Sequence, residues 1–306
     1  CQSDSSRTAY PDVRCVVNIN ADLEAATHYG RSIALVGDAA ATLARLNAEL
    51  ARHRSSSASV NSPWMAACAE QRQRWEALKA ERYATPILYD EKWGGHLLTQ
   101  VAAVKVATDW AREHDAITFF DAGDVQANGL QVVEDDRWGR TYTDTGASYM
   151  GFAVSALLAT AMSSQPFYGL AISGDGSFTM SPQILIDGVA QGARGCILLM
   201  DNRRMAAISA LQLEQYGADH ATDDQVAVDY VAWAQAVEGL RAVDGGRSPR
   251  ALRAALERAH AYEGLSLIHL PVYYGPDPLG GLGAYGRWNV GNWVPETQAL
   301  RHEIGL

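Results

Sequence analysis

Residues 167–202 read as a strand, a helix and a second strand, and both strands end in polar residues. Residues 167–173 and 195–200 are apolar runs of strand length, and residues 182–192 between them have the pattern of a helix. Two strands joined by a crossover helix pair in parallel. Because the chain after residue 84 continues to alternate helix and strand, the sequence predicts an α/β fold with a mostly parallel sheet flanked by helices on both faces.

The remaining periodic segments complete this outline. The other expected strands are residues 13–19, 32–38, 116–121, 240–243 and 265–270. The other expected helices are residues 39–53, 64–83, 95–114, 148–162, 228–238 and 249–263. A serine-rich stretch at residues 54–63 indicates a linker, so the sequence predicts an N-terminal part and a larger part that begins near residue 84.

Gly174, Asp175, Gly176 and Ser177 follow the first strand directly. The two glycines let the backbone turn sharply and approach a ligand closely, and the backbone N–H groups near Ser177, where a helix begins, suit an anion. Asp175 and Asn202 lie at the ends of adjacent strands and offer hard oxygen ligands, which Mg²⁺ prefers. The pattern therefore predicts a site for Mg²⁺ and a diphosphate.

A dinucleotide site of the Rossmann type is the alternative for the same fold class. Such a site needs G-x-G-x-x-G at the start of a helix and an acidic residue about 20 positions later. Here an acid, Asp175, stands between Gly174 and Gly176. A carboxylate repels a bare pyrophosphate but attracts one that carries Mg²⁺, so the sequence favours the Mg-diphosphate interpretation.

These residues resemble the signature of thiamine-diphosphate (ThDP) enzymes, in which GDG is followed at this distance by an asparagine at a strand end. The usual Asn-Asn pair is Asp201-Asn202 here. The resemblance implies that Asp175, the side chain of Asn202 and the backbone carbonyl of Arg204 hold Mg²⁺. It also implies that the cofactor contacts Gly174, Asp175, Gly176, Ser177, Asn202, Met205 and Ala206.

Two further segments resemble parts of the same family. Residues 145–151 are similar to the segment whose bulky apolar residue bends the cofactor. Met150 would be that residue, and the backbone carbonyl of Ser148 would accept a hydrogen bond from the aminopyrimidine, so these two are the catalytic candidates. Residues 120–125, a strand that ends in a glycine turn, resemble the segment that wraps the diphosphate. The cofactor-binding residues expected there are Gly123, Asp124 and Val125.

Within this family the chain resembles the acetohydroxyacid synthase branch. Its glycine- and tryptophan-rich residues 283–296 are similar to the ending of the 3D-trihydroxycyclohexane-1,2-dione hydrolases of that branch. Residues 10–20 and 32–39 resemble the last strands and helix of the branch's Rossmann-like central domain. The resemblance divides the chain into part of a central domain (1–53), a linker and helix (54–83), and a diphosphate-binding domain with a C-terminal tail (84–306).

The resemblance implies a ThDP-dependent transferase or lyase that forms or cleaves carbon–carbon bonds. Three functions stay open: acetolactate-synthase-like decarboxylation and carboligation of 2-oxo acids, hydrolytic cleavage of a cyclic 1,2-dione, and a non-catalytic scaffold subunit. The residues that follow the expected Mg²⁺ ligands Asn202 and Arg204 have small side chains, which favour a roomy substrate pocket. These expected pocket residues are Ala206, Ala207, Ile208, Ser209, Leu211 and Gln212.

Relatives of this branch carry a pyrimidine-binding domain, with the glutamate that activates the cofactor, before the residues that this chain matches. The chain is therefore one subunit of a split enzyme or a fragment. We expect a companion subunit that supplies this domain and its glutamate, in a heterotetramer with two copies of each chain.

The amino-acid composition argues against several other classes of protein. The chain has 306 residues, of which 48% are hydrophobic and 20% charged, so it can bury a sizeable core. The net charge of −10 argues against nucleic acid as a partner. No apolar run reaches the roughly 18 residues of a membrane span. Its four cysteines are scattered without C-x-x-C spacing, which favours free thiols and a cytoplasmic location.

Overall fold

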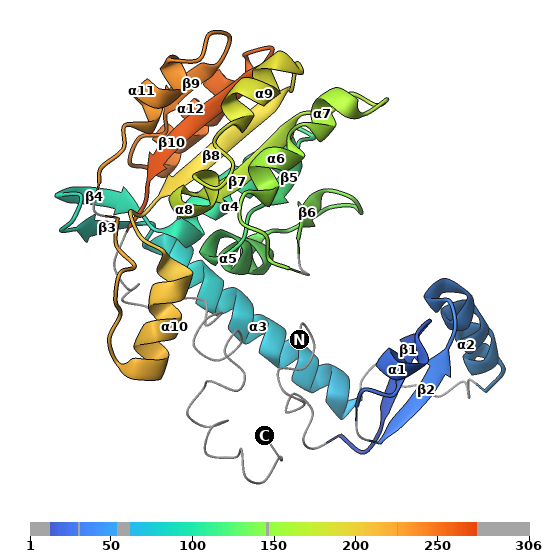
Figure 1. Ribbon diagram of the computed structural model, residues 1–306. Coiled ribbons are helices and arrows are strands. Elements are labelled where there is room, and N and C mark those ends of the chain that lie inside the picture. The colour runs from blue at the N-terminus through green and yellow to red at the C-terminus, as the bar shows by residue number, and fades with distance from the viewer. Residues whose placement is uncertain (1–12, 30, 54–61, 145–146, 225, 274–306) are drawn as a thin grey trace. The chain divides into compact units, whose positions relative to one another are not determined.

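The computed structural model describes residues 13–29, 31–53, 62–144, 147–224 and 226–273 (Figure 1). The chain divides into two compact units, and the boundary between Glu76 and Ala77 lies inside helix α3 (Pro63–Ala84). Most of the expected linker and the whole of the expected tail, residues 283–296, lie outside the described residues.

The first unit contains a parallel pair of strands, β1 (Val16–Asn20) and β2 (Ser32–Val36), in which Val16 is opposite Ser32. The short helix α1 (Leu23–Ala26) connects them, and α2 (Ala39–His53) follows β2. The Asn18 side-chain amide donates a hydrogen bond to the Ala25 carbonyl over 2.8 Å and so ties β1 to the crossover. The two strands and the helix expected here are confirmed.

The second unit is built on a six-stranded parallel sheet in the order β6-β5-β7-β8-β10-β9 (Figure 1). Its strands are β5 (Ile117–Phe120), β6 (Thr141–Thr143), β7 (Gly169–Gly174), β8 (Gly195–Asp201), β9 (Arg241–Asp244) and β10 (Leu265–Pro271). The central strands β7 and β8 are buried almost throughout, because helices cover both of their faces. The predicted parallel α/β sheet is confirmed.

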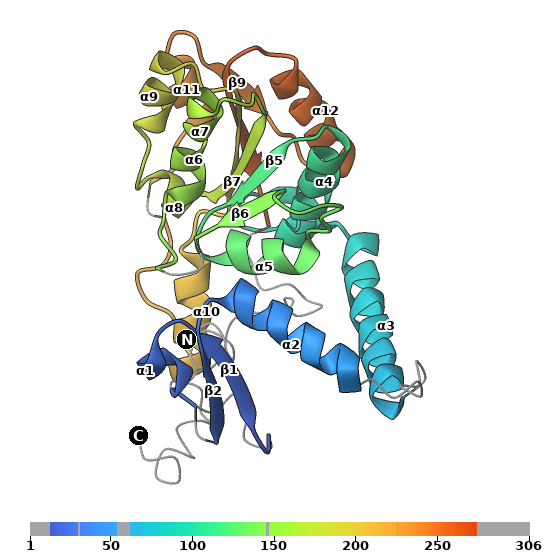
Figure 2. The ribbon, with the colours of Figure 1, turned by 90° about the vertical axis from the view of Figure 1, so that its right-hand side faces the viewer.

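Helices cover the sheet on two sides (Figure 2). One face carries α4 (Gln100–Glu113), α5 (Asp124–Val132) and α12 (Pro249–His260). The other carries α6 (Phe152–Ala156), α7 (Ala159–Met162), α8 (Asp175–Phe178), α9 (Ile184–Ala190) and α11 (Tyr230–Gln235). On this second face Phe119, Ala171, Ile197 and Leu267 form a buried cluster with Phe178. Burial of these apolar side chains holds the helices on the sheet.

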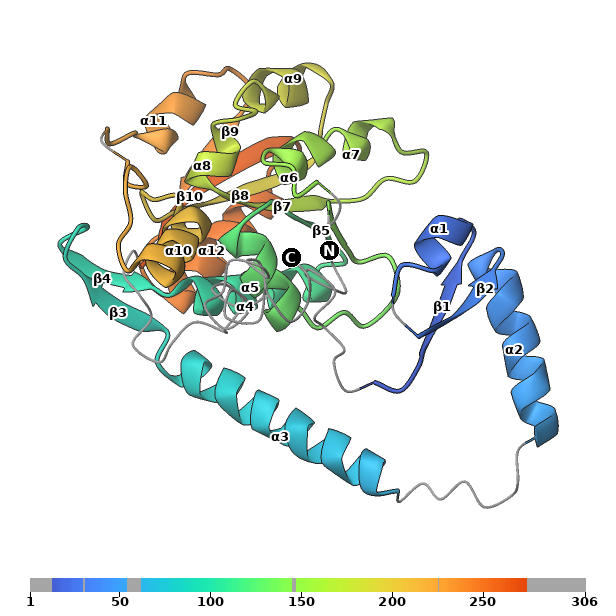
Figure 3. The same ribbon diagram turned by 60° about the horizontal axis from the view of Figure 1, so that its bottom comes forward.

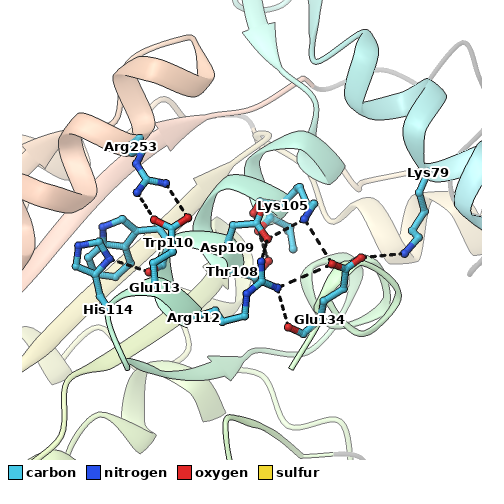
Figure 4. A network of polar contacts seen from close by, with 11 residues as sticks. Lys79, Lys105, Thr108, Asp109, Trp110, Arg112, Glu113, His114, Glu134 and Arg253 are labelled. Carbon is cyan, nitrogen blue, oxygen red and sulfur yellow. Dashed lines mark hydrogen bonds and ion pairs between the residues drawn. The ribbon is translucent and has the colours of Figure 1, made fainter. Parts of the chain in front are cut away.

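A polar network joins the helices of the first face at their exposed edges (Figure 4). Arg112 of α4 donates to the Glu134 carbonyl beyond α5, while Arg253 of α12 pairs with Glu113 of α4. The indole N–H of Trp110, which is fully buried, donates to Glu257 over 3.0 Å. These contacts fix α4 between its two neighbours, because each long side chain spans from one helix to the next.

The helix expected at residues 95–114 is wrong at its start. β4 (Gly95–Leu98) is a strand that pairs antiparallel with β3 (Ile87–Asp90), and α4 begins only after Thr99. The Thr99 hydroxyl accepts a hydrogen bond from the Ala102 N–H over 3.3 Å and so caps the helix. Pairing with the preceding strand β3 decided the conformation of residues that helical periodicity also fits.

The helix expected at residues 148–162 is interrupted and starts late. Ser148 and Gly151 both have left-handed backbone, with φ of 53° and 91°, so helix α6 begins only at Phe152. A turn at residues 157–158 separates α6 from α7. The left-handed backbone sets the conformation of Tyr149 and Met150 and keeps them out of the helix.

Within the described residues, no helix is both long enough and apolar enough to cross a membrane.

Candidate functional site

The ends of β5, β7 and β8 meet at one edge of the sheet of the second unit. Helices α5, α8 and α10 (Ala206–Tyr216) lie at this edge (Figure 3). Between them is a cavity of about 250 Å³. It is lined by every residue predicted for the cofactor and metal: Gly123, Asp124, Val125, Ser148, Met150, Gly174, Asp175, Gly176, Ser177, Asn202, Arg204, Met205 and Ala206. Ligands of open α/β sheets bind at this kind of edge.

The substrate-pocket prediction is only partly met. Ala206, Ala207, Ile208 and Leu211 line the cavity. Ser209 is instead fully buried and hydrogen-bonded to Arg204 and Asp219, and Gln212 accepts from the His220 N–H over 2.6 Å. The segment forms helix α10, which turns these two side chains away. Gln100, Ala122 and Met200 also line the cavity. Ala122 belongs to the segment 120–125 that the sequence marked, whereas no motif marked Gln100 and Met200.

Asp175 is the first residue of α8 and follows β7 without an intervening loop. Its side chain is only 3% exposed, and its Oδ2 atom is buried without a hydrogen-bond partner in the described part of the chain. Burial, together with the nearby carboxylates of Asp201 and Asp224, raises the pKa of Asp175 to about 8. A buried acceptor that lacks a donor is costly, and a bound cation would remove that cost.

Gly176 is required by close packing. A Cβ atom added there would lie 2.5 Å from Met205 Sδ and 3.8 Å from Met150 Cε. The glycine therefore lets the two methionine side chains approach the turn after β7, one from the segment before α6 and the other from the loop after β8.

The loop after β8 presents Asn202 to the cavity. Asn202 is 8% exposed, and its Oδ1 atom accepts a hydrogen bond from the Arg204 N–H over 3.1 Å. Asp201 is also buried and accepts from the Arg203 N–H over 2.9 Å. Arg203 has a left-handed φ of 57°, so both short side chains brace a tight turn.

His269 of β10 completes the support of this loop, and the sequence had given it no role. Its Nε2 atom lies 2.9 Å from Asp201 Oδ2. Its ring also packs near Trp93, over which the Arg203 guanidinium lies at 5.6 Å. No local pattern could have revealed this histidine, because three helices and a strand of the described chain separate it from Asp201.

Met150 is held in the cavity by its neighbour Gly151. The Gly151 N–H donates to Asp121 Oδ1 over 2.8 Å, and Asp121 is completely buried. The other oxygen of Asp121 accepts from the Ser173 hydroxyl over 2.8 Å. One carboxylate thus joins the end of β5 to the Met150 segment and to the end of β7. Burial raises the pKa of Asp121, while these hydrogen bonds oppose the shift.

Gly123 is the N-cap residue of α5, whose first N–H groups have no partner inside the helix. Such a helix start attracts an anion. Asp124 is the first helical residue and faces the same cavity. Burial raises its pKa to about 6, against the opposing positive charge of Arg204. The carboxyl of Asp124 therefore gives up its negative charge more readily than an exposed aspartate.

The donor set fits the cation and diphosphate of the expected cofactor. No group of three or more His, Cys, Asp and Glu side chains among the described residues could hold a metal. A cation at Asp175 would therefore depend on the Asn202 amide, on backbone carbonyls and on ligand oxygens, which is the mixed shell that Mg²⁺ takes with phosphates. The unpartnered Asp175 Oδ2 atom is the observation that supports this fit.

A protein-family model describes the same region. Residues 121–270 match the family "Thiamine pyrophosphate enzyme, C-terminal TPP binding domain". The match covers the strands β6, β7, β8, β9 and nearly all of β10, begins directly after β5, and contains most of the residues that line the cavity.

Curated relatives agree with this match. Over 310 residues, the chain is 29% identical to 3D-(3,5/4)-trihydroxycyclohexane-1,2-dione hydrolase of Listeria monocytogenes serotype 4b (strain F2365), in an alignment that covers 94% of this chain and 47% of the relative. The protein of the same name from Shouchella clausii is 32% identical over 161 residues, which cover 49% of this chain and 24% of the relative. The chain spans about half the length of the curated relatives that it matches over most of its length.

Solved structures share the fold. Benzoylformate decarboxylase from Polynucleobacter necessarius superposes with a TM-score of 0.52 at 21% identity, over 59% of this chain and 34% of that one. A thiamine diphosphate-dependent 4-hydroxybenzoylformate decarboxylase from Rhodococcus jostii RHA1 gives a TM-score of 0.51 at 16% identity, over 58% and 33% of the two chains. At these identities the likeness concerns the fold alone.

Proposed function

Residues 121–270 belong to the thiamine pyrophosphate enzyme family as its C-terminal cofactor-binding domain, and from this we propose that the chain is the ThDP- and Mg²⁺-binding part of an enzyme that forms or cleaves carbon–carbon bonds. The observation that carries the proposal is the unpartnered Oδ2 atom of Asp175, buried at the end of β7 in a cavity that Asn202 also lines. A buried carboxylate oxygen without a donor fits a cation site.

The residues divide into three groups with different proposed roles. Asp175, the Asn202 side chain and the Arg204 carbonyl would hold Mg²⁺. The backbone from Gly123 to Val125 at the start of α5, and from Gly174 to Ser177 after β7, would cradle the diphosphate. Ser148, Met150, Met205 and Ala206 would contact the rings.

When bound, ThDP supplies a nucleophilic carbon and an electron sink for carbon–carbon chemistry. This chain's part is to hold and orient that group. Asp121, through the Gly151 N–H, fixes the backbone on which Met150 and the Ser148 carbonyl are presented. Apolar side chains from α10, Ile208 and Leu211, cover the cavity and limit the access of water.

Hydrolytic cleavage of a cyclic 1,2-dione is the reaction that we put first. Its support is the similarity to relatives named trihydroxycyclohexanedione hydrolases along most of this chain. Acetolactate-synthase-like carboligation of 2-oxo acids is the second candidate, because the same cofactor chemistry serves both. A scaffold subunit without catalysis is the least favoured, because a scaffold gains nothing from a buried carboxyl whose Oδ2 atom has no hydrogen-bond partner among the described residues.

We further propose that a companion polypeptide or region supplies the pyrimidine-binding domain with its glutamate, in an assembly with two copies of each part. The support is that the chain spans about half of the curated relatives. Such an interface would be large enough to be obligate. A cytoplasmic setting stays a prediction from the scattered cysteines.

Calorimetry on the full chain tests the cofactor proposal. ThDP is titrated in the presence of Mg²⁺ into the wild type, into Asp175→Ala and into Asp187→Ala, a control in which an exposed carboxylate of α9 is removed. We expect Asp175→Ala to weaken binding about 100-fold or more, because loss of a direct ligand should cost at least as much as loss of its outer partners, which costs about 10- to 100-fold. We expect Asp187→Ala to match the wild type. Full ThDP affinity in Asp175→Ala contradicts the proposed site.

Activity assays test the companion proposal separately. The chain by itself, with saturating ThDP and Mg²⁺, should bind the cofactor but turn over neither 2-oxo acids nor cyclic 1,2-diones. Turnover should appear when a polypeptide with the pyrimidine-binding domain is added. Full turnover by this chain alone would show that no companion is needed.

A further inference from the structure

A segment after α10 pairs with the loop that presents Asn202. The Met205 N–H donates to the Thr222 carbonyl over 2.7 Å, and the Asp224 N–H donates to the Arg203 carbonyl over 3.0 Å. Between these bonds Arg204 and Asp223 form an antiparallel bridge. The backbone of residues 222–224 is therefore fixed directly beside the loop whose carbonyl at Arg204 is a proposed Mg²⁺ ligand.

Three acids of this region face different partners. Asp219 lies 3.2 Å from the Arg204 guanidinium, and Asp223 lies 3.3 Å from Lys92 Nζ. Asp224, in contrast, places its carboxyl within hydrogen-bonding reach of the carboxyl of Asp175. Two of the three acids are thus paired with cations of this chain, while the third is set against another acid.

The contact between Asp224 and Asp175 is unfavourable as it stands. Asp175 is 3% exposed, and its Oδ2 atom lacks a donor among the described residues. Two carboxylates that face each other at this distance repel. A divalent cation between them would remove the repulsion, and Asp175 lines the cavity together with Asn202.

We propose that the Asp224 carboxylate is an additional ligand of the divalent cation that Asp175 and Asn202 hold. The inference rests on the proposed function and adds a residue to its metal site. The affinity of oxygen-ligand sites for hard cations rises with the number of charged ligands. A second carboxylate therefore lets this chain bind Mg²⁺ before any diphosphate is present.

Calorimetry with Mg²⁺ alone, without ThDP, tests this on the full chain. The variant is Asp224→Asn, and the matched control is Asp223→Asn, which removes the same charge from the adjacent residue. We expect Asp224→Asn to weaken Mg²⁺ binding about tenfold and Asp223→Asn to weaken it by less than about threefold, as for a partly exposed ion pair. Equal effects in the two variants overturn the proposal.

A metal-preference measurement keeps the test independent of small changes in stability. Asp224→Cys replaces a hard oxygen by a soft thiolate, which should shift the preference of the site from Mg²⁺ towards Cd²⁺. Asp223→Cys controls for the new thiol. A shift in Asp224→Cys alone supports direct ligation, and an unchanged ratio of Cd²⁺ to Mg²⁺ affinity contradicts it.

The outcomes separate this inference from the proposed function. Wild-type protein that binds no Mg²⁺, with or without ThDP, overturns both. Wild-type protein that binds Mg²⁺ and ThDP, with Asp224→Asn equal to its control, overturns only the role of Asp224. Tighter Mg²⁺ binding in Asp224→Asn would show that the Asp224 carboxyl opposes cation binding, and this also overturns the ligand role.

Discussion

Asp121 Oδ1 accepts a hydrogen bond from the Gly151 N–H over 2.8 Å. The same carboxylate also accepts hydrogen bonds from the Ala122 N–H and the Ser173 hydroxyl. The side chains of Asp121 and Ser173 are completely buried. Three chain segments that line the cofactor cavity therefore share one acceptor.

The Asp121→Ala substitution should destabilise the second unit by about 3 kcal/mol or more, because it leaves several buried donors without an acceptor. Ser173→Ala, which removes only one of the donors, should cost about 1 kcal/mol. Urea denaturation of the two variants measures the difference. Equal losses would mean that Asp121 does not join the three segments.

The Met150→Ala substitution should lower turnover more than cofactor affinity. Met150 packs near Gly176 and lines the cavity. We expect Mg²⁺ and the diphosphate to supply most of the binding energy of the cofactor. We expect turnover to fall about tenfold or more and ThDP affinity to change by less than about threefold, because misplacement of a reacting group mainly costs rate. Met162→Ala, at a side chain that is 83% exposed, is the control. Parallel losses in both quantities would contradict an orienting role.

The His269→Ala substitution should weaken Mg²⁺ and ThDP binding, because His269 supports the buried carboxylate of Asp201 beside the metal loop. Loss of such an outer partner typically costs 10-fold to about 100-fold in metal affinity. The double variant Asp201→Asn with His269→Ala should regain much of the affinity, because a buried amide without a partner costs less than a buried carboxylate without one. His96→Ala, at an exposed position of β4, is the control. If the double variant does not regain affinity, His269 does not act by supporting Asp201.

Asp124 should make the stability of the ligand-free protein depend on pH. Burial raises its folded-state pKa to about 6, above the ordinary aspartate value of 3.8, so the folded state binds this proton more tightly than the unfolded state does. The stability that Asp124 contributes is therefore fully present below about pH 4 and is lost as the pH rises through about 6.

The Asp124→Asn substitution should accordingly stabilise the ligand-free protein at pH 7.5 by roughly 1 to 3 kcal/mol and have little effect at pH 4. Urea denaturation at the two pH values measures this, with Asp187→Asn as the exposed control. A stabilisation of equal size at both pH values would show that the titration of Asp124 is not its cause.

Local sequence patterns were enough to predict the strands that lead into the site and the turns that follow them. The apolar runs before Gly123, Asp175 and Asn202 predict strands that end in ligand-binding turns, because burial on both faces of a sheet leaves a signature within a few residues. The late start of α6 at Phe152 and the strand β4 could not be predicted in the same way. The first depends on left-handed backbone at Ser148 and Gly151, and the second on pairing with β3.

By itself, the sequence determined that this chain forms a parallel α/β sheet and which side chains stand at the strand ends. Only the tertiary structure decided which distant groups support them. The sheet order places β5, β7 and β8 side by side, and it brings His269 to Asp201 and Asp121 to Gly151. Asp224 reaches Asp175 through backbone pairing with the loop after β8. Such partners carry no periodicity or spacing, because their contacts arise only when the whole sheet is assembled.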